Sequence, residues 1–262
     1  AQKLYVIGVT GTDGKTTTVS LIYHILKSSG LKVSMISSIG AVIEGKNFDT
    51  GFHVTTPTSF SLQKFLRKAR SAKSEYFVLE ITSHAIDQHR IFGIPFKVGV
   101  LTNITNEHMD YHKPFDKYLK TKITLLEKSE TAVVNSDDSS YILLSEAKIK
   151  KTQEKWVTYG LSESSDFNPK TFDVRKANLV GEFNKYNTLA AIATSKTLGI
   201  KEENIKRALK TFHMPIGRAD YVYQKDFSVM IDFAHTPNAF ENILSSMRSV
   251  TKGRIIHVFG SA

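Results

Sequence analysis

The residues most plainly suited to chemistry lie near the start of the chain, where Gly8–Thr18 reads GVTGTDGKTTT. An apolar run precedes this stretch and apolar residues at helical spacing follow it, which predicts a strand, a tight loop and a helix. Glycines let backbone N–H groups crowd around an anion, and the helix N-terminus adds partial positive charge. Lys15 would reach the outer phosphates, and the Thr16 hydroxyl would bind Mg²⁺. The full phosphate-loop pattern places a glycine where this chain has Val9, so we interpret the stretch as a shortened variant. The alternative is a Gly-rich turn that merely opens a helix.

A second candidate is Glu80, the one carboxylate in the apolar run of residues 76–82. Burying a lone glutamate is costly unless it is paired or bound to a metal ion. It stands at the carboxyl end of a predicted strand, where α/β sheets bind their ligands. We interpret Glu80 as a Mg²⁺ ligand. The alternative is a strand-end glutamate that is exposed to solvent or paired with a lysine.

Three further polar segments are candidates to line a ligand site. Residues 55–58 read TTPT and either cap the next helix or offer hydroxyl groups to a polar ligand. Residues 83–90 read SHAIDQHR, which is too polar for a core. They form either a solvated helix turn or a loop in which Arg90 binds a carboxylate or phosphate. Residues 107–112 hold two histidines and two carboxylates, but the spacing does not match the His-Glu-x-x-His zinc pattern. A single histidine beside Mg²⁺ and ATP is chemically feasible, although oxygen ligands are usual for that ion.

The elements that would position these residues predict an α/β fold, with a mostly parallel central sheet flanked by helices. A hairpin or long excursion is predicted around residues 45–47. Lys122 reads as a surface lysine on its helix. Asn184 and Asn187 are three apart and share a helix face, with asparagine caps as the alternative. Besides the opening strand and helix, strands are predicted at 32–37, 76–82, 96–102, 131–135, 156–160 and 171–179, and helices at 59–72, 115–127, 181–198 and 201–212.

Residues 215–220 predict an interdomain connection, which divides the chain into a domain of residues 1–217 and a second α/β unit of residues 218–262. The second unit is predicted to run strand, helix, strand, at 228–232, 238–250 and 254–259. One such unit cannot bury both faces of a parallel strand pair, so we expect it to be partial.

The composition narrows the classes of protein. With 262 residues and 41% hydrophobic content, the chain is long enough for one large domain or two smaller ones. It has no cysteine, which excludes disulfides and thiolate metal sites. No apolar run approaches the length of a membrane span, and no secretory leader is visible. The net charge is +10, and because the basic residues are scattered we expect phosphorylated small-molecule ligands rather than nucleic acid.

Taken together, these motifs resemble the Mur ligase family, the ATP-dependent amino-acid ligases of peptidoglycan synthesis. Within that family the chain is most similar to the UDP-N-acetylmuramoyl-dipeptide ligases, which add the third residue of the stem peptide. The segments that carry the resemblance are in family order: 11–17, 55–58, 80–90, 102–112, 181–187, 217–218 and 232–237.

The resemblance implies a set of roles. The nucleotide would be ATP with Mg²⁺, and the substrates would be the UDP-muramoyl-dipeptide and an amino acid. Catalysis would rest on Lys15, His108 and Lys122, the last carbamylated in the family to hold a second Mg²⁺. Metal ligands would be Thr16, Glu80, His108 and Lys122. The UDP-muramoyl-dipeptide would be held by Thr55, Thr56, Ser83, Gln88 and Arg90. ATP would be bound by Gly11, Thr12, Asp13, Gly14, Lys15, Thr16, Thr17, Asn184, Asn187, Arg218, Asp232 and His235.

The resemblance also implies departures. Asp13 stands where the family usually has asparagine, and Glu107 where aspartate is usual. The family's N-terminal domain and most of its C-terminal domain are expected to be missing, so weak or absent turnover is expected of this chain alone. A cytoplasmic monomer is expected. The alternatives are a folylpolyglutamate- or cyanophycin-synthetase-like ligase, an inactive nucleotide-binding module, and a nucleic-acid-binding NTPase.

Overall fold

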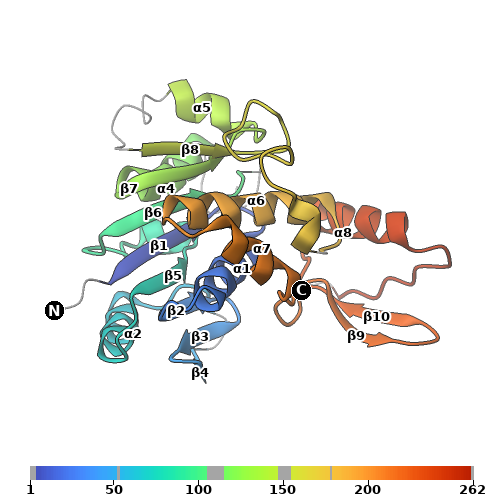
Figure 1. Cartoon of the computed structure of the whole chain (residues 1–262), viewed down its shortest axis with the longest axis horizontal. Helices are drawn as coiled ribbons and strands as arrows, with labels where there is room; N and C mark the ends of the chain where they lie inside the picture. The colour runs from blue at the N-terminus through green and yellow to red at the C-terminus, as the bar shows by residue number, and fades with distance from the viewer. Residues whose placement is uncertain (1–3, 52–53, 105–114, 147–154, 178, 261–262) are drawn as a thin grey trace.

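The molecule is built on one mixed sheet of eight strands, in the order β4-β3-β2-β5-β1-β6-β7-β8 (Figure 1). The computed structural model describes residues 4–51, 54–104, 115–146, 155–177 and 179–260. Six strands run parallel, and β3 and β4 add an antiparallel edge. The strands are β1 (Tyr5–Thr10), β2 (Val33–Ser37), β3 (Gly40–Ile43), β4 (Lys46–Phe48), β5 (Tyr76–Glu80), β6 (Phe96–Leu101), β7 (Ser129–Asn135) and β8 (Lys155–Tyr159).

Strand β1 lies at the centre, between β5 and β6. Its carboxyl end therefore opens between the carboxyl ends of two parallel neighbours. Where the chain connections of two adjacent parallel strands run in opposite directions, a crevice opens at this edge of the sheet. Ligands of α/β proteins bind in such a crevice. The register pairs Val9 with Glu80 and Thr10 with Leu101, which brings the phosphate loop beside both predicted ligand segments.

Helices cover both faces of the sheet because its parallel strands are apolar on both sides. One face carries α1 (Lys15–Ser28), α6 (Glu182–Thr197) and α7 (Glu202–Lys210), which cross in front of the sheet in Figure 1. The other face carries the buried side chains of α2 (Ser59–Ser71), α3 (Ser83–Asp87), α4 (Phe115–Glu127) and α5 (Ser140–Glu146). The predicted hairpin around residues 45–47 is confirmed by β3 and β4, and the helix predicted at 115–127 by α4.

One local prediction is wrong, and one element was missed. Residues 171–179 hold no strand among those described; a short 3₁₀-helix, η2 (Val174–Ala177), packs against α6 and α7. Helix α5 was not predicted. Its start is fixed by Asp138, whose carboxylate accepts hydrogen bonds from the backbone N–H and hydroxyl of Ser140. Such local carboxylate bonds favour helix starts over plain turns.

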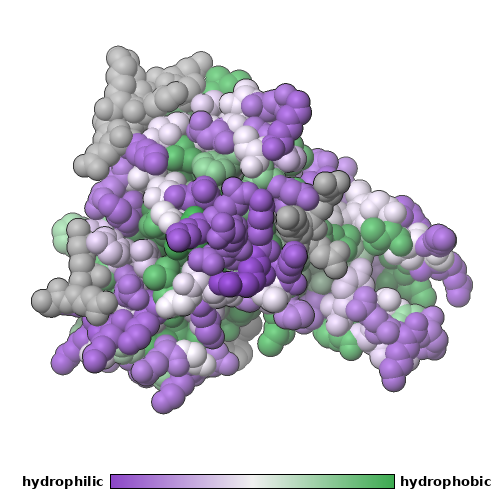
Figure 2. Space-filling view, in the orientation of Figure 1, coloured by the Kyte–Doolittle hydropathy of each residue, from purple (hydrophilic) through white to green (hydrophobic). Residues whose placement is uncertain are grey.

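The C-terminal segment forms a hairpin followed by a helix rather than the predicted strand, helix, strand. Strands β9 (Asp220–Gln224) and β10 (Ser228–Ile231) pair antiparallel, and α8 (Pro237–Val250) follows. The strand predicted at 254–259 is absent, and those residues take no regular structure. Here an apolar run predicted a strand, but a run forms one only where another strand pairs with it. Figure 2 shows hydrophobic surface over this part. The exposed hydrophobic residues of this segment include Phe227 and Ile231.

No helix among the described residues is long and apolar enough to cross a membrane.

The packing of α1 against α6 leads to a stability prediction. Leu189 of α6 is fully buried in the cluster that contains the apolar face of α1. Leu189→Ala should lower the free energy of unfolding by about 2–5 kcal/mol, because it leaves a cavity. The same change at Leu143, which is 38% exposed, should cost less than about 1 kcal/mol. Urea unfolding measures both, and equal losses would contradict this placement of the core.

Candidate functional site

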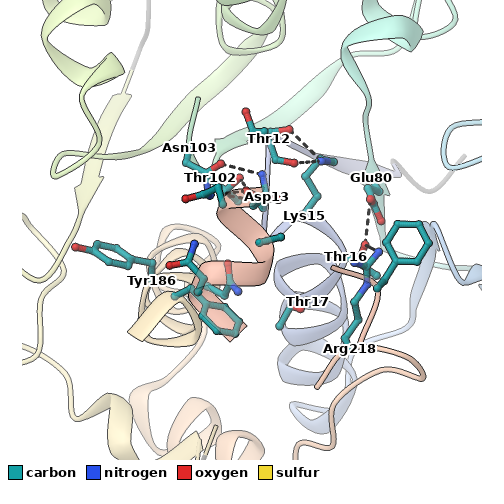
Figure 3. A pocket seen from close by; sticks show the side chains of 18 of the residues that line it. Thr12, Asp13, Lys15, Thr16, Thr17, Glu80, Thr102, Asn103, Tyr186 and Arg218 are labelled. Atoms are coloured by element: carbon teal, nitrogen blue, oxygen red, sulfur yellow. Dashed lines mark hydrogen bonds between the residues drawn. The ribbon is translucent and has the colours of Figure 1, made fainter. Parts of the chain in front are cut away.

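The phosphate loop is held in shape by the end of the neighbouring strand β6 (Figure 3). The backbone N–H of Asp13 donates to Asn103 Oδ1 at 2.8 Å, and the N–H of Thr12 donates to the Asn103 carbonyl at 2.9 Å. The hydroxyl of Thr102 donates to the Asp13 carbonyl at 2.6 Å. The loop therefore has a fixed form before any ligand arrives, and ligand binding needs less ordering.

Two glycines are required by this form. Gly14 is the residue before α1 and has a φ of +78°, which favours glycine. A Cβ there would lie 2.2 Å from Asn187 Oδ1, and a Cβ on Gly11 would lie 1.8 Å from Thr102 Oγ1. The loop is thus clamped from α6 on one side and from β6 on the other.

Two lysines converge on one carbonyl oxygen of the loop. Lys15 Nζ donates to the Gly11 carbonyl at 3.1 Å and to the Thr12 carbonyl at 2.5 Å. Lys122 Nζ also donates to the Gly11 carbonyl, at 2.7 Å, and lies over the ring of Tyr118. Lys122 is 1% exposed, so its interpretation as a surface lysine is wrong: α4 turns it inward, beneath the loop. Two ammonium groups at one point create a strong local attraction for an anion.

Beside the loop lies a cluster of oxygen atoms around Glu80. The carboxylate is 2% exposed; it accepts a hydrogen bond from the Thr16 hydroxyl at 3.1 Å and from the Ser38 N–H at 2.9 Å. The hydroxyls of Thr16 and Ser38 are 2.9 Å apart. The alternative of a solvent-exposed Glu80 is therefore wrong. A carboxylate with two hydroxyls is the donor set that Mg²⁺ prefers, so these residues fit that ion.

The C-terminal segment reaches into the same site. Arg218 Nη2 donates to the hydroxyls of Thr16 and Ser38, each at 3.2 Å. Asn238, in the first turn of α8, donates from Nδ2 to Asp13 Oδ2 at 3.2 Å. Asp232 instead holds its own turn, because its two oxygens accept from the backbone N–H groups of residues 219 and 234.

Helix α6 supplies the far wall of the site. Asn187 Nδ2 donates to Asn184 Oδ1 at 3.1 Å, and Asn184 in turn donates to the Val180 carbonyl, so only Asn187 lines the cavity. Next to it, the Tyr186 hydroxyl donates to Asp137 Oδ2 at 3.2 Å. Burial, and then the charge of Asp137, raise the pKa of Tyr186 to about 12, so this side chain is a neutral donor at pH 7.

These groups surround one cavity of about 610 Å³. Of the residues proposed to bind the muramoyl substrate, Thr55 and Ser83 line it. Thr56 lies beneath, where its hydroxyl donates to the Glu80 carbonyl. Gln88 and Arg90 do not line it; they bond to each other, and Arg90 Nη1 donates to the Thr56 carbonyl. Other predicted site residues that line the cavity are Gly11, Thr12, Asp13, Gly14, Lys15, Thr16, Thr17, Glu80, Lys122, Asn187, Arg218, Asp232 and His235. His108 falls outside the described residues.

Sequence reasoning missed several residues of this site, among them Ser38, Tyr186 and Asn238. Ser38 follows β2, and the sheet order brings the end of β2 beside Glu80. Tyr186 was passed over between two asparagines that were singled out, although a residue next to Asn187 can face the same cavity. Asn238 could have been found only from the fold, because it meets Asp13 across 225 residues of sequence.

Comparison with known proteins identifies the family. Residues 9–195 match the model of the Mur ligase middle domain, and residues 217–262 match that of the Mur ligase glutamate ligase domain. The chain belongs to the Mur ligase family. The UDP-N-acetylmuramoyl-L-alanyl-D-glutamate--2,6-diaminopimelate ligase 1 of Clostridium acetobutylicum is 36% identical over 280 residues, covering 99% of this chain and 57% of that protein. The chain therefore spans little more than half the length of this relative.

Solved structures agree on the fold. A UDP-N-acetylmuramoyl-L-alanyl-D-glutamate--2,6-diaminopimelate ligase superposes with a TM-score of 0.75 and 23% identity, over 94% of this chain and 54% of that one. The apo form of L. casei FPGS superposes with a TM-score of 0.74 and 19% identity, over 97% and 73%. The expected α/β fold of a Mur ligase is therefore confirmed.

The clamp on Gly14 leads to a second prediction. Gly14→Ala should lower the free energy of unfolding by about 1–3 kcal/mol more than Gly30→Ala, because only the first new methyl group meets a neighbour. Gly30 is a matched control: its φ of +85° carries the same backbone strain, of about 1–2 kcal/mol, with nothing within 4 Å of the added Cβ. Equal losses in urea unfolding would mean that Asn187 does not pack against the loop.

The Tyr186–Asp137 pair leads to a third prediction. Asp137→Asn should lower the pKa of Tyr186 from about 12 toward 10, because it removes the charge that disfavours the phenolate. Glu182→Gln is the control, since Glu182 acts on Tyr186 only through its charge and more weakly. Because the pKa is raised on folding, the stabilisation is full below pH 10 and is lost as the pH rises through about 12. NMR titration of the tyrosine ring resonances tests this, and no shift in Asp137→Asn would exclude the pair.

Proposed function

We propose that this chain is the nucleotide-binding part of an ATP-dependent carbon–nitrogen ligase of peptidoglycan precursor synthesis. The observation that carries the proposal is the convergence of a phosphate loop, the Glu80 oxygen cluster and buried Lys122 in one cavity of a Mur ligase chain. The substrates proposed are UDP-N-acetylmuramoyl-L-Ala-D-Glu and an amino acid. The name of the 36%-identical relative supports 2,6-diaminopimelate as the first amino acid to test.

In the proposed reaction, the substrate carboxylate attacks the γ-phosphorus of ATP and ADP leaves, which gives an acyl phosphate. The incoming amine then attacks the acyl carbon, loses a proton, and phosphate leaves. Lys15 lies on the loop, where it can attract the transferred phosphoryl group. Thr55 and Ser83 line the same cavity as Glu80, where they can position the carboxylate substrate. Such enzymes act mainly by positioning the groups and neutralising their charge.

Mg²⁺ would be held by Thr16, Ser38 and Glu80, and would neutralise the phosphate charge. Asn187 and Arg218 are proposed to bind the nucleotide with the loop, and His235, which is exposed at the cavity, is proposed with them. Asp232 is proposed to act through the turn that it holds. Roles for His108 and for a carbamylated Lys122 remain proposals from the family resemblance. We propose two domains, residues 1–217 and 218–262. We also propose that the protein is a cytoplasmic monomer. Because its proposed substrates are ATP and a UDP-linked precursor, we propose that it binds no nucleic acid.

The direct test is phosphate release with ATP, the UDP-muramoyl-dipeptide and a panel of amino acids. Both this chain and a form extended to the length of its relatives are assayed. Release that requires diaminopimelate or another diamino acid is expected in the longer form. Release driven by a folate would instead favour the FPGS-like alternative, since the apo form of L. casei FPGS superposes with a TM-score of 0.74. ATP binding without turnover in the longer form would favour an inactive nucleotide-binding module.

Lys122 leads to a fourth prediction. Lys122→Ala should lower phosphate release by about 100-fold or more, as loss of one preorganised electrostatic group commonly does. If the lysine is carbamylated, small carboxylates such as acetate should partly restore the rate, because they replace the lost anion. Lys120→Ala is the matched control, since Lys120 lies on the same helix and is exposed. Unchanged turnover in Lys122→Ala would exclude the proposed role.

A further inference from the structure

The guanidinium of Arg218 lies against the atoms proposed to hold the cation. Its Nη2 donates to Thr16 Oγ1 and to Ser38 Oγ, each at 3.2 Å. The same Thr16 hydroxyl donates to Glu80 Oε1 at 3.1 Å and lies 2.9 Å from Ser38 Oγ. A hydroxyl has one hydrogen and two lone pairs. With Glu80 taking the hydrogen, Arg218 and Ser38 are partners for the two lone pairs of Thr16.

The charges around Arg218 are those that a cation site presents. Arg218 is half-buried, and desolvation lowers its pKa, while the carboxylates of Glu80, Asp232 and Asp13 raise it. The guanidinium stays charged in any case, because its pKa is so high. Its other side is covered by the ring of Phe233, 4.4 Å from the guanidinium carbon. A positive charge thus lies near three carboxylates and against one aromatic ring.

The backbone fixes this position. Gly217 and Ala219, which flank Arg218, have φ values of +70° and +45°, and the second is unfavourable for a residue with a Cβ. The Ala219 N–H donates to Asp232 Oδ2 at 2.7 Å, and the Gly217 N–H donates to Asp220 Oδ2 at 3.3 Å. This turn is strained, and two carboxylates hold it in place. Arg218 therefore has a defined position, unlike a surface arginine that samples many rotamers.

We propose that the Arg218 guanidinium and the divalent cation compete for the oxygen atoms of Thr16 and Ser38, so that the cation and the docked 217–220 turn exclude each other. This inference rests on the cation site of the proposed function. A metal ion at Thr16 needs the lone pair that Arg218 now engages, and a divalent cation repels the guanidinium at such a distance. Arrival of the cation therefore expels Arg218 from the cluster and leaves it available to an anion bound in the loop.

The exchange gives the C-terminal segment a means to sense the site. Arg218 belongs to the segment that matches the glutamate ligase domain, whereas Thr16, Ser38 and Glu80 belong to the middle domain. Cation binding and docking of the 217–220 turn are then linked, and linkage of this kind is reciprocal. The second contact across these segments, Asn238 to Asp13, uses none of the three cation-site residues and provides an internal reference.

The test measures Mn²⁺ binding to the whole chain without nucleotide, by electron paramagnetic resonance. Arg218→Met should bind Mn²⁺ about tenfold more tightly than the wild type, within the usual range of site-to-site coupling. Arg218→Lys keeps the charge but not the planar fork, so an affinity between the two is expected. Arg248→Met is the matched control for net charge, because Arg248 is exposed and, among the described residues, its side chain donates to backbone carbonyls near its own helix end. It should bind as the wild type does.

Adding Glu80→Gln to Arg218→Met should abolish the tight Mn²⁺ site, which locates it. Equal or weaker binding by folded Arg218→Met would overturn the inference. If all variants bind Mn²⁺ together with an ATP analogue but Arg218→Met shows no higher affinity than the wild type, this inference is overturned and the proposed cation site is not. No Mn²⁺ in any variant, with or without the analogue, would overturn the proposed cation site as well.

A measurement on the wild type avoids any folding defect of the variants. Saturating Mg²⁺ should shift the guanidinium NMR resonances of Arg218, because Nη2 then loses its bonds to Thr16 and Ser38. The guanidinium resonances of Arg248, which donates to the carbonyls of Thr251 and Gly253, should not change. Unchanged Arg218 resonances at saturating Mg²⁺ would contradict the exchange of cation and guanidinium.

Discussion

The burial of one carboxylate governs the rest of this site. Glu80 ends a strand that is covered on both faces, and its side chain is almost completely withdrawn from water. A buried carboxylate must be hydrogen-bonded and near a positive charge, or it destabilises the fold by several kcal/mol. Here the Thr16 hydroxyl and the Ser38 N–H provide the hydrogen bonds, and Arg218 provides the charge. The requirement joins β5, α1, the end of β2 and the C-terminal segment at one point.

The phosphate loop depends on a similar constraint of close contact. Its glycines admit the side chains of Thr102 and Asn187, which leave no room for a Cβ. Those contacts come from β6 and α6, so the loop cannot take its form in isolation. The central position of β1 makes this arrangement feasible, because its neighbours on both sides run parallel and end at the same edge. The form of the loop is therefore a product of the sheet order as much as of the loop sequence.

Periodicity and local chemistry were sufficient for much of the fold. The strand–loop–helix of the phosphate loop, the hairpin at β3 and β4, and α4 follow from alternation, glycine placement and helical spacing. These features are local, so they can be read from neighbouring residues. The errors were made where strand formation depends on a pairing partner. The apolar run at 254–259 takes no strand form, since no described strand pairs with it. The β9 strand was not expected, although its partner β10 follows it directly in a hairpin.

The site divides in the same way. Lys15, Thr16 and Glu80 could be predicted, since each stands at a strand end or in a motif. Residue-by-residue reasoning failed for Lys122, because only the tertiary packing of α4 shows that this lysine turns inward, and only the family resemblance drew attention to it. Arg218 was expected to contact a nucleotide, but its bonds to Thr16 and Ser38 cross about 200 residues of sequence and leave no local signal.

The central claim is that Glu80 and its neighbours hold Mg²⁺ for a nucleotide in the adjoining loop. Calorimetric titration of the chain with a non-hydrolysable ATP analogue, with and without Mg²⁺, tests this claim most directly. In the wild type, Mg²⁺ should tighten binding by about tenfold or more, the range usual for coupling between two sites. In Glu80→Gln that dependence on Mg²⁺ should disappear, while binding without Mg²⁺ should persist through the loop. An equal gain from Mg²⁺ in both proteins would contradict the account.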